Sequence, residues 1–263
     1  MKPRALQQAV VRMLFDPAYV VAVRGDGPVD GLGERERALL RRIDPRAFAT
    51  DRHRRARAIQ ALVDEYPASA AALGLDALEP FFSSPAFHAC VARRGSMALA
   101  FGTWLEDQAG GPGVIERAGA ELRRRAPAPP PPPDGAPHLL RCGLNLAPLI
   151  VPAGSLAWYQ DARAALGDVP LAALAGRPPR PGVPRRAAGR RADEHLLLEH
   201  HPDDTLSLGT ASEPLVRLLR HAERPRTVKA LGAEAVARGA ALADVPDLLA
   251  GLLAEGLLVR VAP

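Results

Sequence analysis

The chain has 263 residues, which is enough for one large domain or two ordinary ones. Hydrophobic residues make up 48% and charged residues 24%, the balance of a soluble globular protein, and only 4% are aromatic, so aliphatic side chains must fill most of the core. The apolar runs are shorter than the roughly 20 residues that a membrane span requires, and the N-terminus lacks the apolar core of a signal peptide. We therefore expect a cytoplasmic protein with no membrane partner.

The net charge of +5 is concentrated in one segment, residues 176–192, which has no acidic residue and without which the chain would be close to neutral. This Arg/Pro strap contains Arg177, Arg180, Arg185, Arg186, Arg190 and Arg191. Such a segment is typical of a solvated linker, although it can also attract nucleic acid or an acidic peptide. The two cysteines, Cys90 and Cys142, are too few for a disulfide framework or a four-ligand zinc site, so we expect reduced thiols.

Residues 1–125 are predicted to form an all-α domain, because apolar residues recur at helical spacing. The first helix covers Leu6 to Leu14 and ends at Asp16-Pro17, and further helices are expected over about 34–43, 51–66, 70–78, 85–105 and 114–125. The inward positions of the second and third helices are predicted as Leu39, Leu40 and Ile43, and then Ala56, Ile59, Leu62, Val63 and Tyr66.

Residues 126–192 are predicted to be a Pro- and Arg-rich linker. Five consecutive prolines, Pro129 to Pro133, favour an extended polyproline spacer. The following segment, 139–151, is either a strand or an apolar arm, and a short helix is expected over 158–166.

Residues 193–263 are predicted to form a second domain with strands. The runs 195–200 and 205–208 flank a Pro-Asp-Asp turn and fit a β-hairpin. Three helices are expected over 213–222, 227–238 and 245–255, with a final strand at 257–261. This order of elements is winged-helix-like. The predicted fold class is therefore mainly α with a small α+β part.

The sequence contains no phosphate-binding loop, dinucleotide glycine fingerprint, nucleophile elbow or metalloprotease helix motif. The residue types that bind iron or zinc gather only at His195, His200, His201, Asp203 and Asp204. Because alternation along a strand places His195 and His200 on opposite faces, we interpret this group as a polar hairpin turn and predict no metal site and no catalytic residue.

Basic side chains crowd the start of the helix at 51–66. Arg52, Arg54, Arg55 and Arg57 follow Asp51, and Arg46 lies in the preceding turn. They fit either a solvated helix face or a docking surface, because arginine forms bidentate contacts with carboxylates across interfaces. The sequence argues against DNA recognition by the winged-helix-like region. The helix at 227–238 is mostly Ala, Leu, Val and Gly, and its only cations are Lys229 and Arg238.

The first half resembles the N-terminal helical domain of partner proteins of multinuclear non-haem iron-dependent oxidative enzymes. The resemblance lies in Leu6-Gln7, the run from Ala38 to Phe48, the run from Arg54 to Leu62, Glu65-Tyr66-Pro67, the region from Phe82 to Phe87, Phe101 and Leu105. The C-terminal hairpin, three helices and strand look like a precursor-peptide recognition element of ribosomal peptide (RiPP) biosynthesis.

This resemblance implies a non-catalytic subunit that holds the leader of a precursor peptide and forms a heterodimer with a TIM-barrel oxidase. The iron is expected in that oxidase, with no cofactor in this chain. The leader would lie in a groove lined by Leu206, Leu208, Leu231 and Val236, and Arg224, Arg226 and Lys229 would attract an acidic leader.

Three other functions stay open at the level of sequence. A winged-helix transcriptional regulator would bind nucleic acid in a salt-dependent way. A free-standing enzyme would carry its own stoichiometric metal, and a structural scaffold would show no peptide specificity.

Overall fold

The computed structural model describes residues 3–29, 31–49, 52–105, 108–126, 130, 132–133, 137–185 and 192–262. Within these residues the protein is mainly helical, with 59% helix, 14 helices and a small sheet part, which confirms the coarse fold class. The chain divides into two compact units. Unit 1 comprises Met1–Glu116 and Trp158–Val183, and unit 2 comprises Arg117–Ala157 and Pro184–Pro263.

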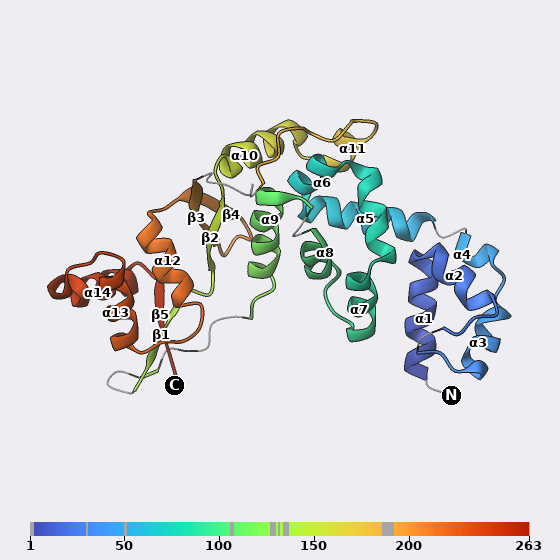
Figure 1. Ribbon diagram of the computed structural model, residues 1–263, viewed down its shortest axis with the longest axis horizontal. Helices are drawn as coiled ribbons and strands as arrows, with labels where there is room; N and C mark the ends of the chain where they lie inside the picture. The colour runs from blue at the N-terminus through green and yellow to red at the C-terminus, as the bar shows by residue number, and fades with distance from the viewer. Residues whose placement is uncertain are drawn as a thin grey trace. The chain divides into compact units, whose positions relative to one another are not determined.

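Unit 1 is built from helices (Figure 1). They are α1 (Pro3–Phe15), α2 (Pro17–Arg24), α3 (Glu34–Arg41), α4 (Arg46–Ala49), α5 (Arg52–Glu65), α6 (Pro67–Leu73), the 3₁₀ helix η1 (Leu75–Ser83), α7 (Pro85–Arg93), α8 (Met97–Leu105), most of α10 (Ser155–Leu166), α11 (Pro170–Leu174) and the first half of α9 (Gly110–Leu122). Helices α2, α6, α7 and α11 begin with proline in the first turn, where its missing N–H costs no hydrogen bond.

All the aromatic residues of the chain belong to unit 1. Phe81 makes ring contacts with Phe82, Phe87, Phe101 and Trp104, with centroids 5.0 to 5.8 Å apart. A second apolar cluster joins α1, α2 and α3 through Ala9, Met13, Tyr19, Val23 and Leu40. The core of unit 2 is therefore wholly aliphatic, apart from the sulfur of Cys142.

The buried carboxylate of Asp16 links α1 and α2 to η1 and α7. It caps α2 through the backbone N–H of Tyr19 (3.2 Å), and it accepts hydrogen bonds from Ser83 Oγ (3.0 Å) and His88 Nε2 (3.1 Å). The other ring nitrogen of His88 lies 3.2 Å from the Arg12 guanidinium. Burial, and then the nearby Arg12, lower the pKa of His88, so the neutral ring donates from Nε2 and accepts at Nδ1.

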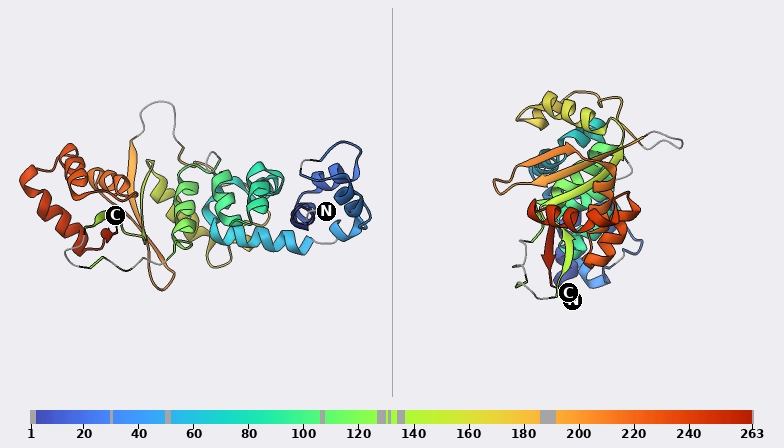
Figure 2. Two further views of the ribbon diagram at one scale, coloured as in Figure 1. Left: turned by 90° about the horizontal axis from the view of Figure 1, so that it is seen from below. Right: turned by 90° about the vertical axis from the view of Figure 1, so that its left-hand side faces the viewer.

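Unit 2 contains two small antiparallel sheets and a helical layer. A three-stranded sheet has the order β2-β3-β4, and β1 pairs with β5 in a second sheet. The elements are β1 (Leu139–Cys142), β2 (Leu146–Pro152), β3 (Asp193–His200), β4 (Leu206–Thr210), α12 (Glu213–His221), α13 (Val228–Ala237), the 3₁₀ helix η2 (Leu242–Asp244), α14 (Val245–Ala254) and β5 (Leu258–Val261). The β3–β4 hairpin is visible as the long orange pair of strands in Figure 2.

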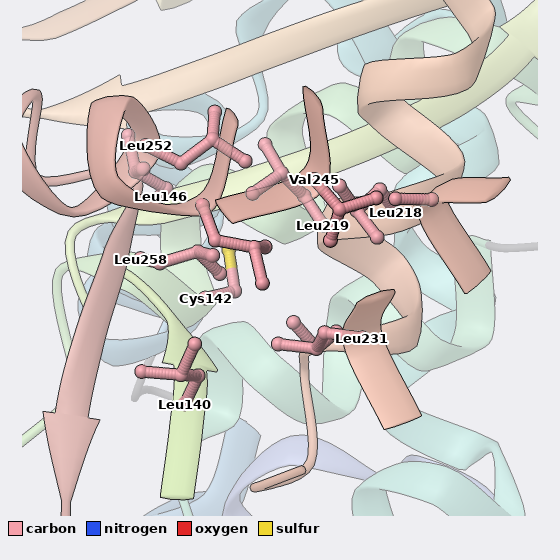
Figure 3. Close-up of a cluster of buried hydrophobic side chains, with 12 residues drawn as sticks. Leu140, Cys142, Leu146, Leu218, Leu219, Leu231, Val245, Leu252 and Leu258 are labelled. Atoms are coloured by element: carbon pink, nitrogen blue, oxygen red, sulfur yellow. The ribbon is translucent and has the colours of Figure 1, made fainter. Parts of the chain in front are cut away.

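Leucine side chains from both sheets and from α12, α13 and α14 converge in one core (Figure 3). Leu140 and Cys142 of β1, Leu146 of β2 and Leu258 of β5 meet Leu231 of α13 there. Two backbone bonds between Leu140 and Arg226, of 2.7 and 2.8 Å, attach β1 to the segment before α13. The ambiguous segment 139–151 thus forms two strands that pair with C-terminal strands, β5 and β3.

Several details differ from the sequence prediction. Leu39 is 41% exposed and Ala56 is also exposed, so neither faces inward as expected. The predicted helix over 85–105 is two helices, because Arg94 adopts a left-handed conformation (φ 54°) and ends α7. Helix α2 was not predicted, since Asp16-Pro17 was interpreted only as a stop, whereas it also starts the next helix. Helix α9 begins at Gly110, four residues before the expected start at residue 114.

Candidate functional site

Strand β4 lies at the outer edge of the three-stranded sheet, where within the described residues it pairs with β3 alone. Two backbone bonds define which groups face β3: His201 N–H donates to Thr205 O, and Ala211 N–H donates to His195 O, both over 2.9 Å. Because hydrogen-bonded and non-bonded pairs alternate in an antiparallel ladder, the backbone groups of Leu206, Leu208 and Thr210 point away from β3. This edge offers donors and acceptors to another extended chain.

Leu206 and Leu208 share one face of the sheet and are half-buried. Helix α9 approaches this face at Gly119, where an added Cβ would lie 2.8 Å from Leu206 Cδ1 and 3.9 Å from Leu198 Cδ2. Leu208 stands opposite Leu198 in the ladder. The two predicted groove residues therefore border the free edge while part of each side chain packs within unit 2.

On the other face of β4, Ser207 and Gly209 are exposed, whereas Leu197 of β3 packs against the core under α12. The helical layer therefore covers the middle of the sheet and leaves this face of its edge strand open. An extended peptide beside β4 would continue the sheet with both backbone and side-chain contacts.

The hairpin turn brings together four members of the histidine and aspartate group, whereas His195 lies five residues before His200 in β3. His200 Nε2 lies 2.8 Å from Asp204 Oδ1, and His201 Nε2 lies 2.9 Å from Ser207 Oγ. Hydrogen bonds from the side chain and backbone of Thr205 lower the pKa of Asp203. No group of three or more metal-binding side chains gathers in the part of the chain that the structure describes.

The predicted cations of the peptide site differ in their surroundings. Arg224 and Lys229 are exposed, whereas Arg226 is half-buried and donates from Nε to His221 O over 3.3 Å. Val236 is 39% exposed on α13. Leu231, also predicted to line the groove, is completely buried in the core of unit 2 and is therefore a packing residue.

The predicted docking arginines lie at α4 and the first turns of α5. Arg46, Arg54 and Arg57 are exposed. Arg55 donates to Glu79 Oε2 over 3.1 Å and lies 5.5 Å from the ring of Phe82, so it helps to hold α5 on η1. The side chain of Arg52 lies outside the described residues.

Burial also raises the pKa values of Cys142, Cys90 and Glu116. It raises the pKa of Cys142 to about 12 and also raises that of the half-buried Cys90, so both are thiols rather than nucleophilic thiolates near neutral pH. Glu116 accepts the backbone N–H groups of Ala68 (2.7 Å) and Ser69 (2.8 Å) at the start of α6. Its complete burial nevertheless raises its pKa to about 7.

Comparison with known proteins gave no family model that matches this chain and no similar curated protein. Among the described residues, no helix combines the length and apolar character needed to cross a membrane. The sequence had named the two side chains on β4 and a wing or hairpin edge as the place for the peptide. It could not tell which strand of the hairpin lies at the edge, because that depends on β2 pairing with β3 from the other side.

Proposed function

We propose that this protein is a non-catalytic partner subunit that binds the leader of a ribosomally made precursor peptide and presents the peptide to a multinuclear non-haem iron TIM-barrel oxidase. The observation that carries the proposal is the outer edge of β4, which pairs with no second strand in the part of the chain that the structure describes, beside two half-buried leucines. Strand addition at such an edge combines backbone hydrogen bonds for affinity with side-chain pockets for register.

The arrangement of unit 2 supports this proposal. The four strands β1 to β4 precede the three helices α12 to α14, and β5 follows them and pairs with β1, an order that fits a winged-helix-like recognition element. Arg224 and Lys229 are exposed cations of the same unit and would attract an acidic leader over a distance set by the ionic strength. The oxidase would supply the iron and the oxygen chemistry, and this chain would supply binding and orientation of the substrate peptide.

The edge can be tested at Thr210, whose N–H points away from β3 and whose side chain is exposed. Thr210→Pro removes that donor and blocks strand addition, whereas Thr210→Val keeps the N–H and is the matched control. With a fluorescently labelled leader of a candidate precursor peptide that the wild-type chain binds, we expect about a tenfold loss of affinity for the proline variant and little change for the valine variant.

Equal affinities of the two variants, with the hairpin intact by circular dichroism, would exclude the β4 edge. Retention of the wild-type chain on DNA with strong salt dependence, and no peptide binding, would instead favour a transcriptional regulator.

A further inference from the structure

Unit 1 contains an apolar groove between α1, the start of α5 and the end of α7. Its volume is about 580 Å³, and α1 and α7 are neighbouring helices (Figure 1). The apolar lining is Leu6, Val10, Val11 and Leu14 of α1 together with Val91 of α7, and Arg54 and Arg94 lie at its sides. Val11 is 37% exposed, so part of this surface is open to solvent.

The dimensions of the groove suit a helix. Its lining along α1 extends from Leu6 to Leu14, which at 1.5 Å per residue is about 12 Å, or roughly two helical turns. An amphipathic helix presents apolar side chains at i, i+3, i+4 and i+7 over the same length. The groove can therefore receive one apolar stripe of a docked helix.

The charged side chains that line the groove are basic. They are Arg54 and Arg94, and among the described residues no acidic side chain lines it. Neither α1 nor α7 contains an acidic residue. The described part of α5 has only basic charges before Asp64, including Arg54 in the groove. An occupant with carboxylates beside its apolar stripe would match this charge pattern.

We propose that this groove seats a surface helix of the oxidase, with an apolar stripe flanked by Asp and Glu side chains. This inference rests on the proposed function and specifies the docking surface on unit 1. A protein helix is favoured over nucleic acid because most of the lining is aliphatic, whereas a nucleic-acid site presents mainly polar and basic side chains to phosphates and bases. It is favoured over a lipid surface because the apolar residues line a concavity rather than a projecting face.

The test measures the affinity of the full-length chain for a candidate multinuclear non-haem iron oxidase. Val11→Glu places a carboxylate in the groove, and Val21→Glu is the matched control, because Val21 is 71% exposed on α2 outside the groove. Arg94→Glu reverses a charge at the side of the groove, with Arg42→Glu on an exposed position after α3 as its control. We expect about a tenfold or greater loss for each groove variant and less than about twofold for each control.

A photo-crosslinking residue at position 11 identifies the occupant, and we expect the crosslink on an oxidase helix that carries carboxylates. Wild-type binding that Val11→Glu and Val21→Glu leave equally strong would overturn the groove proposal alone. Absence of any wild-type complex would overturn the proposed function together with it. Binding to vesicles of phosphatidylserine and phosphatidylcholine that Val11→Glu abolishes, with no effect on the oxidase complex, would assign the groove to a lipid surface instead.

Discussion

The buried carboxyl group of Glu116 makes unit 1 sensitive to pH. Its carboxylate holds the first two free N–H groups of α6, yet complete burial raises its pKa from 4.5 to about 7. Glu116→Gln removes the ionisation and keeps a carbonyl oxygen as an acceptor. The substitution is therefore best judged by how the free energy of unfolding depends on pH, and not by its value at a single pH.

The direction in which the free energy of unfolding changes with pH follows from proton binding. Between pH 4.5 and about 7 the folded chain holds a proton on Glu116 that the unfolded chain has released, so the free energy of unfolding falls as the pH rises through this window. The full difference corresponds to about 3 kcal/mol, most of which falls between pH 5 and pH 8. The glutamine variant lacks this contribution.

Tryptophan fluorescence during urea unfolding isolates unit 1, because Trp104 and Trp158 both belong to it. The wild-type free energy of unfolding minus that of Glu116→Gln is expected to fall by about 2–3 kcal/mol between pH 5 and pH 8. Other titrating groups, such as His88, contribute to both proteins and cancel in this difference. A difference that stays constant over the range would refute the reasoning.

Four further substitutions test the packing of the two units. Asp16→Ala removes the cap of α2 and two side-chain hydrogen bonds, and we expect unit 1 to lose about 2–4 kcal/mol in the same fluorescence assay. Leu231→Ala should destabilise unit 2 by about 2–5 kcal/mol by amide hydrogen exchange, whereas Val236→Ala on the same helix should cost less than about 1 kcal/mol. Gly143→Ala should destabilise unit 2 by about 1–3 kcal/mol, because the new Cβ would lie 2.7 Å from the carbonyl oxygen of Gly256, and an unchanged melting temperature would contradict this close approach.

Helices and strands could be predicted from the sequence where the spacing of apolar residues and the positions of turn residues agreed. The hairpin of β3 and β4 and the three helices α12 to α14 lie close to their predicted ranges, because polar turn residues separate short apolar runs there. Helix α2 was missed because a proline both ends one helix and begins another, and the sequence alone does not distinguish these roles.

Long-range contacts account for the remaining differences. The partners of β1 and β2 lie far away along the chain, in β5 and β3, so the segment 139–151 could not be assigned from its own residues. The groove on unit 1 was likewise not foreseen, because it depends on α1, α5 and α7 meeting. The arginines at the start of α5 did point towards it, since Arg54 lines one side.

Reconstitution of the reaction tests the central claim most directly. The oxidase and the precursor peptide are incubated with and without this chain, and the mass of the peptide is measured. We predict a mass change that requires both proteins, is lost with Thr210→Pro and is retained with Thr210→Val. Modification that proceeds equally well without this chain, or that this chain performs without the oxidase, would contradict the account.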